Sequence, residues 1–202
     1  MIDNTKNEEI LKASSIIKDG GIVVFPTETV YGIGTDALNN SAIEKLYNIK
    51  KRPHKKPISV LVSNFEMITK VAKEISDIEW KIIKNFFPGP LTIVLTKKES
   101  ISNILTGGEA TIGVRMPDNQ IALKLIEYVG KPVATSSANI SGERSGIDIE
   151  NIKKTFVDKV DYYLEGKYNK TSIPSTVIKV KNGEIEILRE GTITKKQIEN
   201  LL

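Results

Sequence analysis

Three polar segments of the sequence carry residue types that could do chemistry. Residues 26–32 place two threonine hydroxyls, a glutamate and a tyrosine between two apolar runs. Residues 50–56 hold five Lys or Arg side chains, and prolines at 53 and 57 stiffen that stretch. Residues 135–142 are mostly small and hydroxyl-bearing. Stiff cations can grip phosphate, and small residues let a ligand reach backbone N–H groups. The three segments therefore predict a site for an anionic ligand.

Each segment also has a structural reading, and the residue types alone leave both readings open. Hydroxyls in turns often bond their own backbone, and a basic run is commonly a solvated loop. The one histidine, His54, lies among lysines, where solvation is its ordinary state. A Ser-His-Asp triad would rest on His54 alone. The sequence has no cysteine, so it excludes disulfides and a zinc site built on sulfur.

Two nucleotide-binding motifs fail. The sequence has no Gly-x4-Gly-Lys-Ser/Thr, so a Walker loop does not hold any ATP. Residues 32–37 fit Gly-x-Gly-x-x-Ala, but the position about 20 residues later, where an acidic residue is expected, falls in the basic run. A dinucleotide-binding fold is therefore discounted.

The composition is that of an ordinary globular protein. Of the 202 residues, 40% are hydrophobic and 27% are charged. The net charge of +4 and the pI of about 9.0 suit nucleotides or RNA but single out neither. The N-terminal stretch is polar, unlike a signal peptide, and no apolar run approaches the roughly 18 residues needed to span a bilayer. We expect a cytoplasmic protein without a membrane partner.

Alternating strands and helices must position the polar segments. Apolar runs predict strands over 22–25, 58–62, 91–96, 111–115, 132–135 and 160–164. Helices are expected over 8–18, 41–50, 65–72, 76–86 and 121–129 and after 148, with capping boxes at Ser41, Ser76 and Thr194. Asn182-Gly183 between two apolar runs predicts a hairpin. The pattern favours a three-layer α/β fold with helices around a mixed sheet.

Seven motifs, taken together and in order, resemble the YrdC family. The resemblance covers roughly residues 10–191. The motifs are Phe25-Pro-Thr-Glu-Thr-Val-Tyr-Gly32, Lys50-Lys-Arg-Pro53, Pro88-Gly-Pro-Leu-Thr92, Gly113-Val-Arg-Met-Pro117, Ser136-Ser-Ala-Asn-Ile-Ser-Gly142, Pro174-Ser-Thr-Val177 and Leu188-Arg-Glu-Gly191. The resemblance implies one YrdC-like catalytic domain over residues 1–202. It also implies a synthase that condenses L-threonine, bicarbonate and ATP to threonylcarbamoyl-AMP and pyrophosphate. Partner proteins of a tRNA threonylcarbamoyl-transferase complex would then take the product.

The family motifs imply a pocket with two halves. The L-threonine half would comprise Thr29, Arg115, Thr135 and Ser175. The ATP half would comprise Lys50, Arg52, Lys56, Thr111, Ser137, Asn139, Ser145 and Arg189. Some relatives carry a threonine-binding histidine where this chain has Leu61, so the amino-acid half is expected to close differently. A sister branch lacks the Ser-x-Asn-x-Ser-Gly loop that this chain retains.

The implied chemistry needs charge stabilisation more than a nucleophile. A carbamate of threonine attacks the α-phosphate of ATP, so every species is anionic. We expect no catalytic nucleophile, with Lys50 and Arg52 as the main contributors, and Mg²⁺ carried by ATP rather than by protein ligands. The main alternative is a double-stranded RNA-binding or ribosome-maturation factor without synthase activity. A module like those of hydrogenase-maturation proteins is a weaker alternative, because those modules are fused to other domains and 202 residues leave no room for them. Weak RNA binding by the synthase itself is also left open.

Overall fold

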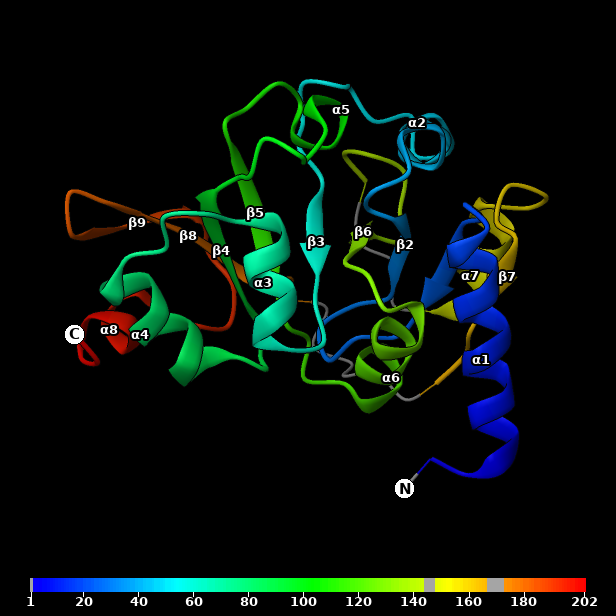
Figure 1. Cartoon of the computed structure of the whole chain (residues 1–202). Helices are drawn as coiled ribbons and strands as arrows, with labels where there is room; N and C mark the ends of the chain where they lie inside the picture. The colour runs from blue at the N-terminus through cyan, green and yellow to red at the C-terminus, as the bar shows by residue number, and fades with distance from the viewer. Residues whose placement is uncertain (1, 144–147, 167–172) are drawn as a thin grey trace.

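The computed structural model describes residues 2–143, 148–166 and 173–202 of the chain (Figure 1). Strands and helices alternate over most of this length. The helices are α1 (Asn4–Lys18), α2 (Asn40–Ile49), α3 (Phe65–Val71), α4 (Asp77–Phe86), α5 (Asn103–Thr106), α6 (Gln120–Val129), α7 (Ile149–Thr155) and α8 (Lys195–Glu199). The strands are β1 (Val23–Phe25), β2 (Gly32–Asp36), β3 (Ser59–Leu61), β4 (Leu91–Thr96), β5 (Thr111–Arg115), β6 (Val133–Ser137), β7 (Tyr162–Tyr163), β8 (Thr176–Lys181) and β9 (Glu184–Arg189).

The strands form one mixed sheet in the order β7-β1-β2-β6-β3-β5-β4-β8-β9. The pairs β1–β7, β3–β5 and β4–β8 are parallel, and the other pairs are antiparallel. This order brings the ends of β3, β5 and β6, which are far apart in sequence, to the middle of the sheet. The predicted α/β fold with a mixed sheet is confirmed.

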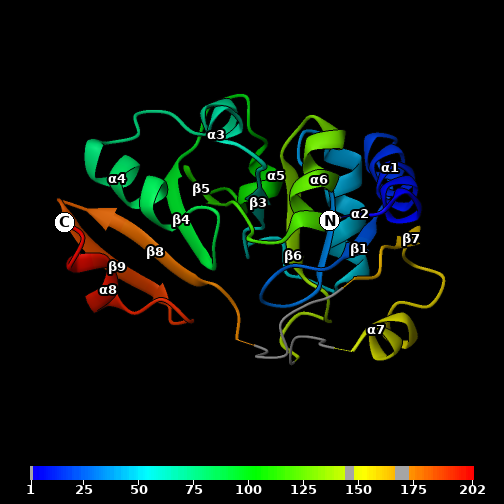
Figure 2. The ribbon, with the colours of Figure 1, turned by 90° about the horizontal axis from the view of Figure 1, so that it is seen from below.

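The helices cover the two faces of the sheet unequally. Figure 2 shows α1, α3, α4 and α6 on one side, while the short α7 and α8 lie toward opposite ends of the other side. Side chains alternate along a strand. Val60, Ile93, Val114 and Ala134 therefore face the main helical layer and are fully buried. In the described chain, the middle of the opposite face is left to polar side chains and loops.

Most predicted elements are confirmed, with some corrections. The first helix begins at Asn4 rather than at about residue 8, because Asp3 caps it through a bond from the Lys6 amide. The short helix α5 was not predicted. The second helix starts one residue earlier than expected, because Asn39 rather than Ser41 caps it through a bond from the Ala42 amide. The third polar segment is not wholly a loop, because β6 continues through Ser136 and Ser137. That extension follows from pairing with β2, in which Gly32 lies opposite Ser137.

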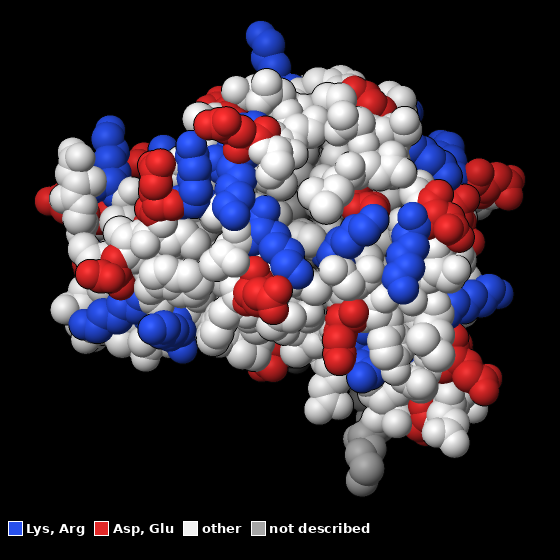
Figure 3. All heavy atoms as spheres, viewed as in Figure 1, with Lys and Arg blue, Asp and Glu red and all other residues white. Residues whose placement is uncertain are grey.

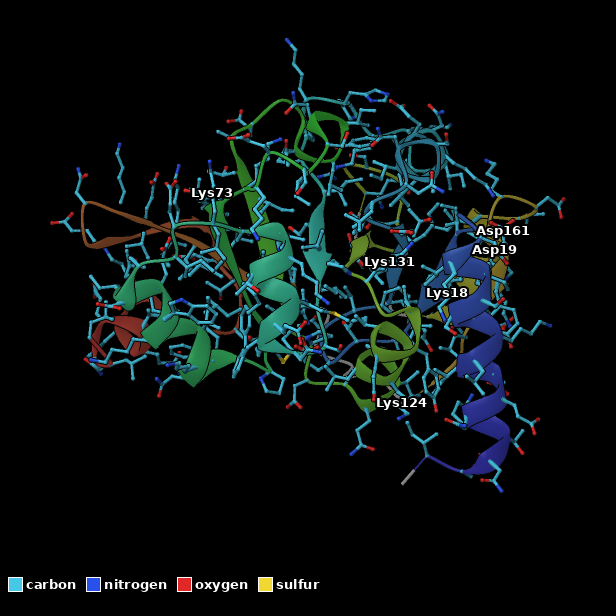
Figure 4. All side chains as sticks on the ribbon, viewed as in Figure 1. Lys18, Asp19, Lys73, Lys124, Lys131 and Asp161 are labelled. Atoms are coloured by element: carbon cyan, nitrogen blue, oxygen red, sulfur yellow. The ribbon has the colours of Figure 1, made fainter. Side chains whose placement is uncertain are left out.

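Ion pairs and a hydrogen bond hold the start of β1 and the end of β2 in place. Lys131, labelled in Figure 4, pairs at 2.7 Å with the buried Asp36 at the end of β2. Asp161, also labelled, accepts from the Ile22 amide at 2.6 Å and from Lys45 at 2.7 Å, which ties the start of β1 to β7. These contacts anchor β1 and β2, the two strands that flank residues 26–31.

The helical face has no single-sign charge field among its described residues. Figure 3 shows Lys and Arg interspersed with Asp and Glu over that side. Exposed pairs of opposite charge, such as Lys70–Glu66 and Lys73–Glu99, account for part of this pattern. In the ranges that the structure describes, no helix is long and apolar enough to cross a membrane.

Candidate active site

The open face of the sheet forms the floor of a cavity of about 180 Å³. Alternate residues of neighbouring strands point into it, among them Leu61 of β3, Arg115 of β5 and Thr135 of β6. Walls come from the loop that contains Thr29, from Arg52, and from Pro174 and Ser175. Segments that are distant in the sequence therefore meet over the centre of the sheet.

All four residues predicted for the threonine half line this cavity. They are Thr29, Arg115, Thr135 and Ser175. Three of the four are buried, and Arg115 is only 7% exposed. The Arg115 guanidinium is held from several sides: Nη2 donates to Thr29 Oγ1 at 3.0 Å and Nε donates to the Gly89 carbonyl at 3.3 Å. A guanidinium positioned in this way is suited to binding a carboxylate.

Glu28 already faces that guanidinium. Its Oε2 lies 2.6 Å from Arg115 Nη2, and both side chains are largely buried. The contact is one of charge, because neither carboxylate oxygen of Glu28 makes an aligned hydrogen bond to any described residue. Thr27 stabilises the turn that contains Glu28, since its hydroxyl donates to the Val30 carbonyl at 2.6 Å. Residues 26–32 therefore form a hydrogen-bonded turn, and Thr27 and Thr29 of this turn line the cavity.

Ser175 links the threonine half to Arg189. Its hydroxyl lies 2.8 Å from Thr92 Oγ1 and accepts from Arg189 Nη2 at 3.0 Å. Arg189 Nη2 and Nε also donate to the Ser175 carbonyl, at 2.8 and 3.1 Å. Gly191 permits this approach, because a Cβ there would lie 2.4 Å from the Pro174 carbonyl oxygen. Arg189 is thereby held at the edge of the cavity.

A second cavity, of about 550 Å³, continues along the same face of the sheet. It shares Arg52, Ser59 and Arg189 with the first cavity and adds Thr111 of β5. Its far side is formed by β8 and β9. The predicted ATP residues Arg52, Thr111 and Arg189 therefore meet in a groove that opens directly into the threonine half.

Three guanidiniums from separate segments converge at the junction. Arg52, Arg115 and Arg189 all line the first cavity. Burial, followed by the charges of Arg115 and Arg52, lowers the pKa of Arg189 below its ordinary value. Burial is also the main cause that lowers the pKa of Arg52. Clustered cations repel one another, so this arrangement favours an anionic ligand between them.

Lys50 has a different place from the one its motif suggested. It is only 1% exposed, and its Nζ donates to the Ser137 and Asn139 carbonyls at 2.6 Å each. Its own carbonyl accepts from the Ser141 amide at 3.0 Å. Burial, and then the Arg52 charge, lower the pKa of Lys50 to about 7. Lys50 thus holds residues 137–141 in place through these hydrogen bonds, and it lines neither cavity.

The remaining predicted ATP residues are divided. Ser137 lines the first cavity, whereas the Asn139 side chain is bonded within its own loop, to the Ile140 and Glu143 carbonyls at 2.8 Å. Lys56 is exposed and lines neither cavity, although its carbonyl accepts from Arg52 Nε at 3.0 Å. Ser145 lies outside the described residues.

Four polar residues that line the cavity were not among the predicted site residues: Thr27, Ser59, Thr92 and Ser136. Thr27 and Ser136 lie in the polar segments singled out from the sequence, whereas Ser59 and Thr92 lie outside them. Thr92 is a buried hydroxyl between the apolar residues Leu91 and Ile93 of β4, and that contrast was a usable signal. Ser59 faces the cavity because Gly113 opposite it has no side chain; a Cβ there would lie 2.5 Å from Ser59 Oγ. Leu61, at the position of the family's histidine, lines the cavity with an apolar side chain.

The described residues contain no group of three or more His, Cys, Asp or Glu side chains placed to hold a metal ion. Glu28 is the acidic residue beside the first cavity, and Arg115 faces it.

Comparison with known proteins gives consistent matches. The model of the Sua5/YciO/YrdC family, described as "Telomere recombination", matches residues 15–191. A threonylcarbamoyl-AMP synthase of Pyrococcus abyssi is 38% identical over 94% of this chain and 56% of its own length. A putative threonylcarbamoyl-AMP synthase of Methanocaldococcus jannaschii is 43% identical over 88% of this chain and 83% of its own length.

The fold also matches that of a solved structure over nearly the whole chain. The crystal structure of P. abyssi Sua5 complexed with L-threonine superposes with a TM-score of 0.93 at 38% identity, covering 97% of this chain and 58% of that one. The chain thus spans little more than half the length of the P. abyssi relative. Both the sequence match and the fold extend across nearly all of this chain, and it belongs to the Sua5/YciO/YrdC family.

Proposed function

We propose that the chain condenses L-threonine, bicarbonate and ATP into threonylcarbamoyl-AMP and pyrophosphate. The convergence of Arg52, Arg115 and Arg189 at the junction of two cavities carries this proposal. A carbamate attacking the α-phosphate places anions on both sides of such a junction. The names of the similar proteins, and the threonine bound in one of them, support the choice of substrates.

The first cavity would hold the amino acid. Arg115 would grip its carboxylate, and the hydroxyls of Thr29, Thr135 and Ser175 would surround the rest of the molecule. A cavity of about 180 Å³ is small for a nucleotide but suits a compact amino acid. Leu61 would pack against the apolar part of threonine, where some family members use a histidine.

The neighbouring groove would hold ATP. Arg52 and Arg189 would contact phosphate, Thr111 would supply a hydroxyl within the groove, and Ser137 would supply one from the adjoining first cavity. We assign Asn139 and Lys50 to shaping the loop next to Ser137, because their polar atoms bond that loop. Lys56 and Ser145 remain proposed ATP contacts from the family motif.

Catalysis would rest on position and charge. The carbamate oxygen forms a bond to the α-phosphorus as the bond to the pyrophosphate oxygen breaks, so negative charge grows on the leaving group. Arg52 and Arg189 would stabilise that charge without transferring a proton. Mg²⁺ bound to ATP would neutralise part of the phosphate charge. Burial of Thr29, Arg115 and Ser175 would keep water from the hydrolysable carbamate.

Pyrophosphate release tests the proposal when each substrate is omitted in turn. Release should require threonine, bicarbonate and ATP together, and mass spectrometry should detect threonylcarbamoyl-AMP. Equal release without threonine would leave a plain ATPase and end the synthase assignment. A tRNA threonylcarbamoyl-transferase complex would consume the product, which can be tested by adding such partners and tRNA.

A further inference from the structure

Thr92 is a neighbour of Arg115 in the sheet, and the proposed function assigns no substrate contact to its hydroxyl. Thr92 is 3% exposed and lines the first cavity. Strands β4 and β5 pair in a register that sets Ile93 opposite Val114, so the next residues outward, Thr92 and Arg115, are cross-strand neighbours. Their side chains point to the same face of the sheet, where opposite residues lie about 5 Å apart. A ligand group held by Arg115 is therefore within reach of Thr92.

Of the two side-chain hydrogen bonds of the Ser175 hydroxyl, the one from Arg189 has a fixed direction, while either hydroxyl could donate in the bond between Ser175 and Thr92. A guanidinium can only donate, so Ser175 Oγ must accept from Arg189 Nη2, 3.0 Å away. Ser175 can then direct its own hydrogen to Thr92 Oγ1, 2.8 Å away. Ser175 is the one side-chain partner of the Thr92 hydroxyl among the described residues. In the arrangement in which Ser175 donates, the Thr92 hydrogen is free to point into the cavity.

The methyl group of Thr92 lies beside Gly113 of β5. A Cβ on Gly113 would lie 3.3 Å from Thr92 Cγ2, so the methyl group of Thr92 occupies space that Gly113 leaves open. The hydroxyl is consequently turned toward Ser175 and the cavity rather than toward β5. A hydrogen-bond donor in this position, next to a buried arginine, matches an acceptor that carries negative charge.

We propose that Thr92 is a further binding residue for the carboxylate of the amino-acid substrate, and that in the bound state Ser175 accepts from Arg189 and donates to Thr92. This inference rests on the proposed function for the identity of the amino acid. It adds a physical link between the two halves of the site, because a nucleotide that draws Arg189 away from Ser175 also releases the orientation of Thr92.

Threonine binding measured by calorimetry without nucleotide tests the role of Thr92. Thr92→Val keeps the shape and removes the hydroxyl, and it should weaken threonine binding about 10-fold or more, as expected for a lost bond to a charged group. Thr92→Ser restores the hydroxyl and should bind nearly as the parent. Thr35→Val is the matched control: Thr35 is also buried, and its hydroxyl donates to the Gly21 carbonyl away from the cavity. Its threonine affinity should equal that of the parent.

L-threoninamide separates carboxylate binding from pocket shape. This probe replaces the charged carboxylate with a neutral amide, so Thr92→Val should change its affinity much less than that for threonine. Equal losses for both ligands, or an unchanged threonine affinity in Thr92→Val, would overturn the proposal.

Threonine binding by an Arg189 variant tests whether Arg189 acts on Thr92 through Ser175. This measurement also tests the proposal if Thr92→Val fails to fold. Arg189→Met should weaken threonine binding even without nucleotide, because Ser175 loses the donor that orients it. An unchanged threonine affinity would overturn the link. Pyrophosphate release by the parent separates this inference from the proposed function: threonine binding that depends on Thr92 in a chain that makes no pyrophosphate would refute the synthase alone.

Discussion

Arg115 Nη2 lies 2.6 Å from Glu28 Oε2 at the floor of the site, and the same nitrogen donates to Thr29 Oγ1 at 3.0 Å. From the sequence alone, Arg115 could either form a structural ion pair or bind the carboxylate of a substrate. Here one guanidinium both forms the ion pair and lines the cavity. A substrate carboxylate would therefore enter a site where Arg115 is oriented in advance and Glu28 is a like charge nearby. Two predictions separate these contributions.

Arg115→Lys should raise the threonine KM while leaving ATP binding without threonine nearly unchanged. Lysine keeps the charge but cannot donate to Thr29, to the Gly89 carbonyl and to a carboxylate in the planar geometry of a guanidinium. Steady-state kinetics and ATP calorimetry provide the two readouts. A folded variant with unaltered threonine kinetics would rule out the clamp, and a parallel fall in both affinities would indicate a structural role only.

Glu28→Gln should lower the free energy of unfolding by about 3 kcal/mol, because it leaves a buried guanidinium without its counter-charge. The same change removes a like charge beside the substrate carboxylate, so threonine should bind at least as tightly as in the parent. Urea unfolding and calorimetry measure the two effects. Glu66→Gln is the control: its pair with Lys70 is mostly exposed, and its loss should cost no more than about 0.5 kcal/mol. Similar losses in the two variants would mean that the buried pair contributes little.

The buried ammonium of Lys50 predicts a pH dependence of stability. Its pKa is lowered from 10.5 to about 7, first by burial and then by the Arg52 charge. Between these two values the unfolded chain binds more protons than the folded chain. The free energy of unfolding should therefore rise as the pH increases from about 7 toward 10.5, by at most about 1.4 kcal/mol per pH unit from this group.

Lys50→Met removes the titrating group and keeps much of the side-chain length. The difference in unfolding free energy between the parent and Lys50→Met should shift in favour of the parent as the pH rises through this window. Lys51→Met, at an exposed neighbouring position, should show no such trend relative to the parent. A pH-independent difference for Lys50→Met would show that the folded state does not lower this pKa.

The sequence was sufficient where function depends on short motifs. The resemblance to the family's motifs implied one pocket with Thr29, Arg115, Thr135 and Ser175, and the structure brings these four residues together. The hairpin at Asn182-Gly183 and the capping boxes at Ser76 and Thr194 were likewise predicted, because their signals lie within a few residues.

Sequence reasoning failed where a role depends on contacts across the sheet. Lys50 in a run of cations reads as solvated or phosphate-bound, but the segment 137–141, almost 90 positions later, buries it. Thr92 becomes part of the site only through the register of β4 with β5 and the approach of Ser175. The cap of α2 was misassigned between two good capping residues, Asn39 and Ser41, since local sequence does not decide where the chain leaves β2.

Arg52 is the residue of the basic segment that the structure turns toward the site. Its Nε donates to the Lys56 carbonyl at 3.0 Å and its Nη2 to the Pro57 carbonyl at 2.8 Å, so the guanidinium is braced against its own loop. It lines both cavities, whereas Lys55 in the same segment is exposed and lines neither. Bracing of this kind reduces the side-chain freedom that would be lost when phosphate binds.

Arg52→Ala should therefore lower kcat/KM for ATP by roughly 10- to 150-fold, the range for losing a bond to a charged group of about 1.5–3 kcal/mol. Threonine binding without nucleotide should change far less, because Arg115 and the hydroxyls of the first cavity remain. Lys55→Ala is the matched control for charge in this loop and should keep ATP kinetics close to those of the parent. Thermal unfolding of both variants checks that loss of the two carbonyl contacts has not unfolded the loop's surroundings. ATP kinetics equal to the parent's in folded Arg52→Ala would mean that the basic segment is a solvated charge run, and the phosphate contacts would then have to come from Arg189 and Ser137.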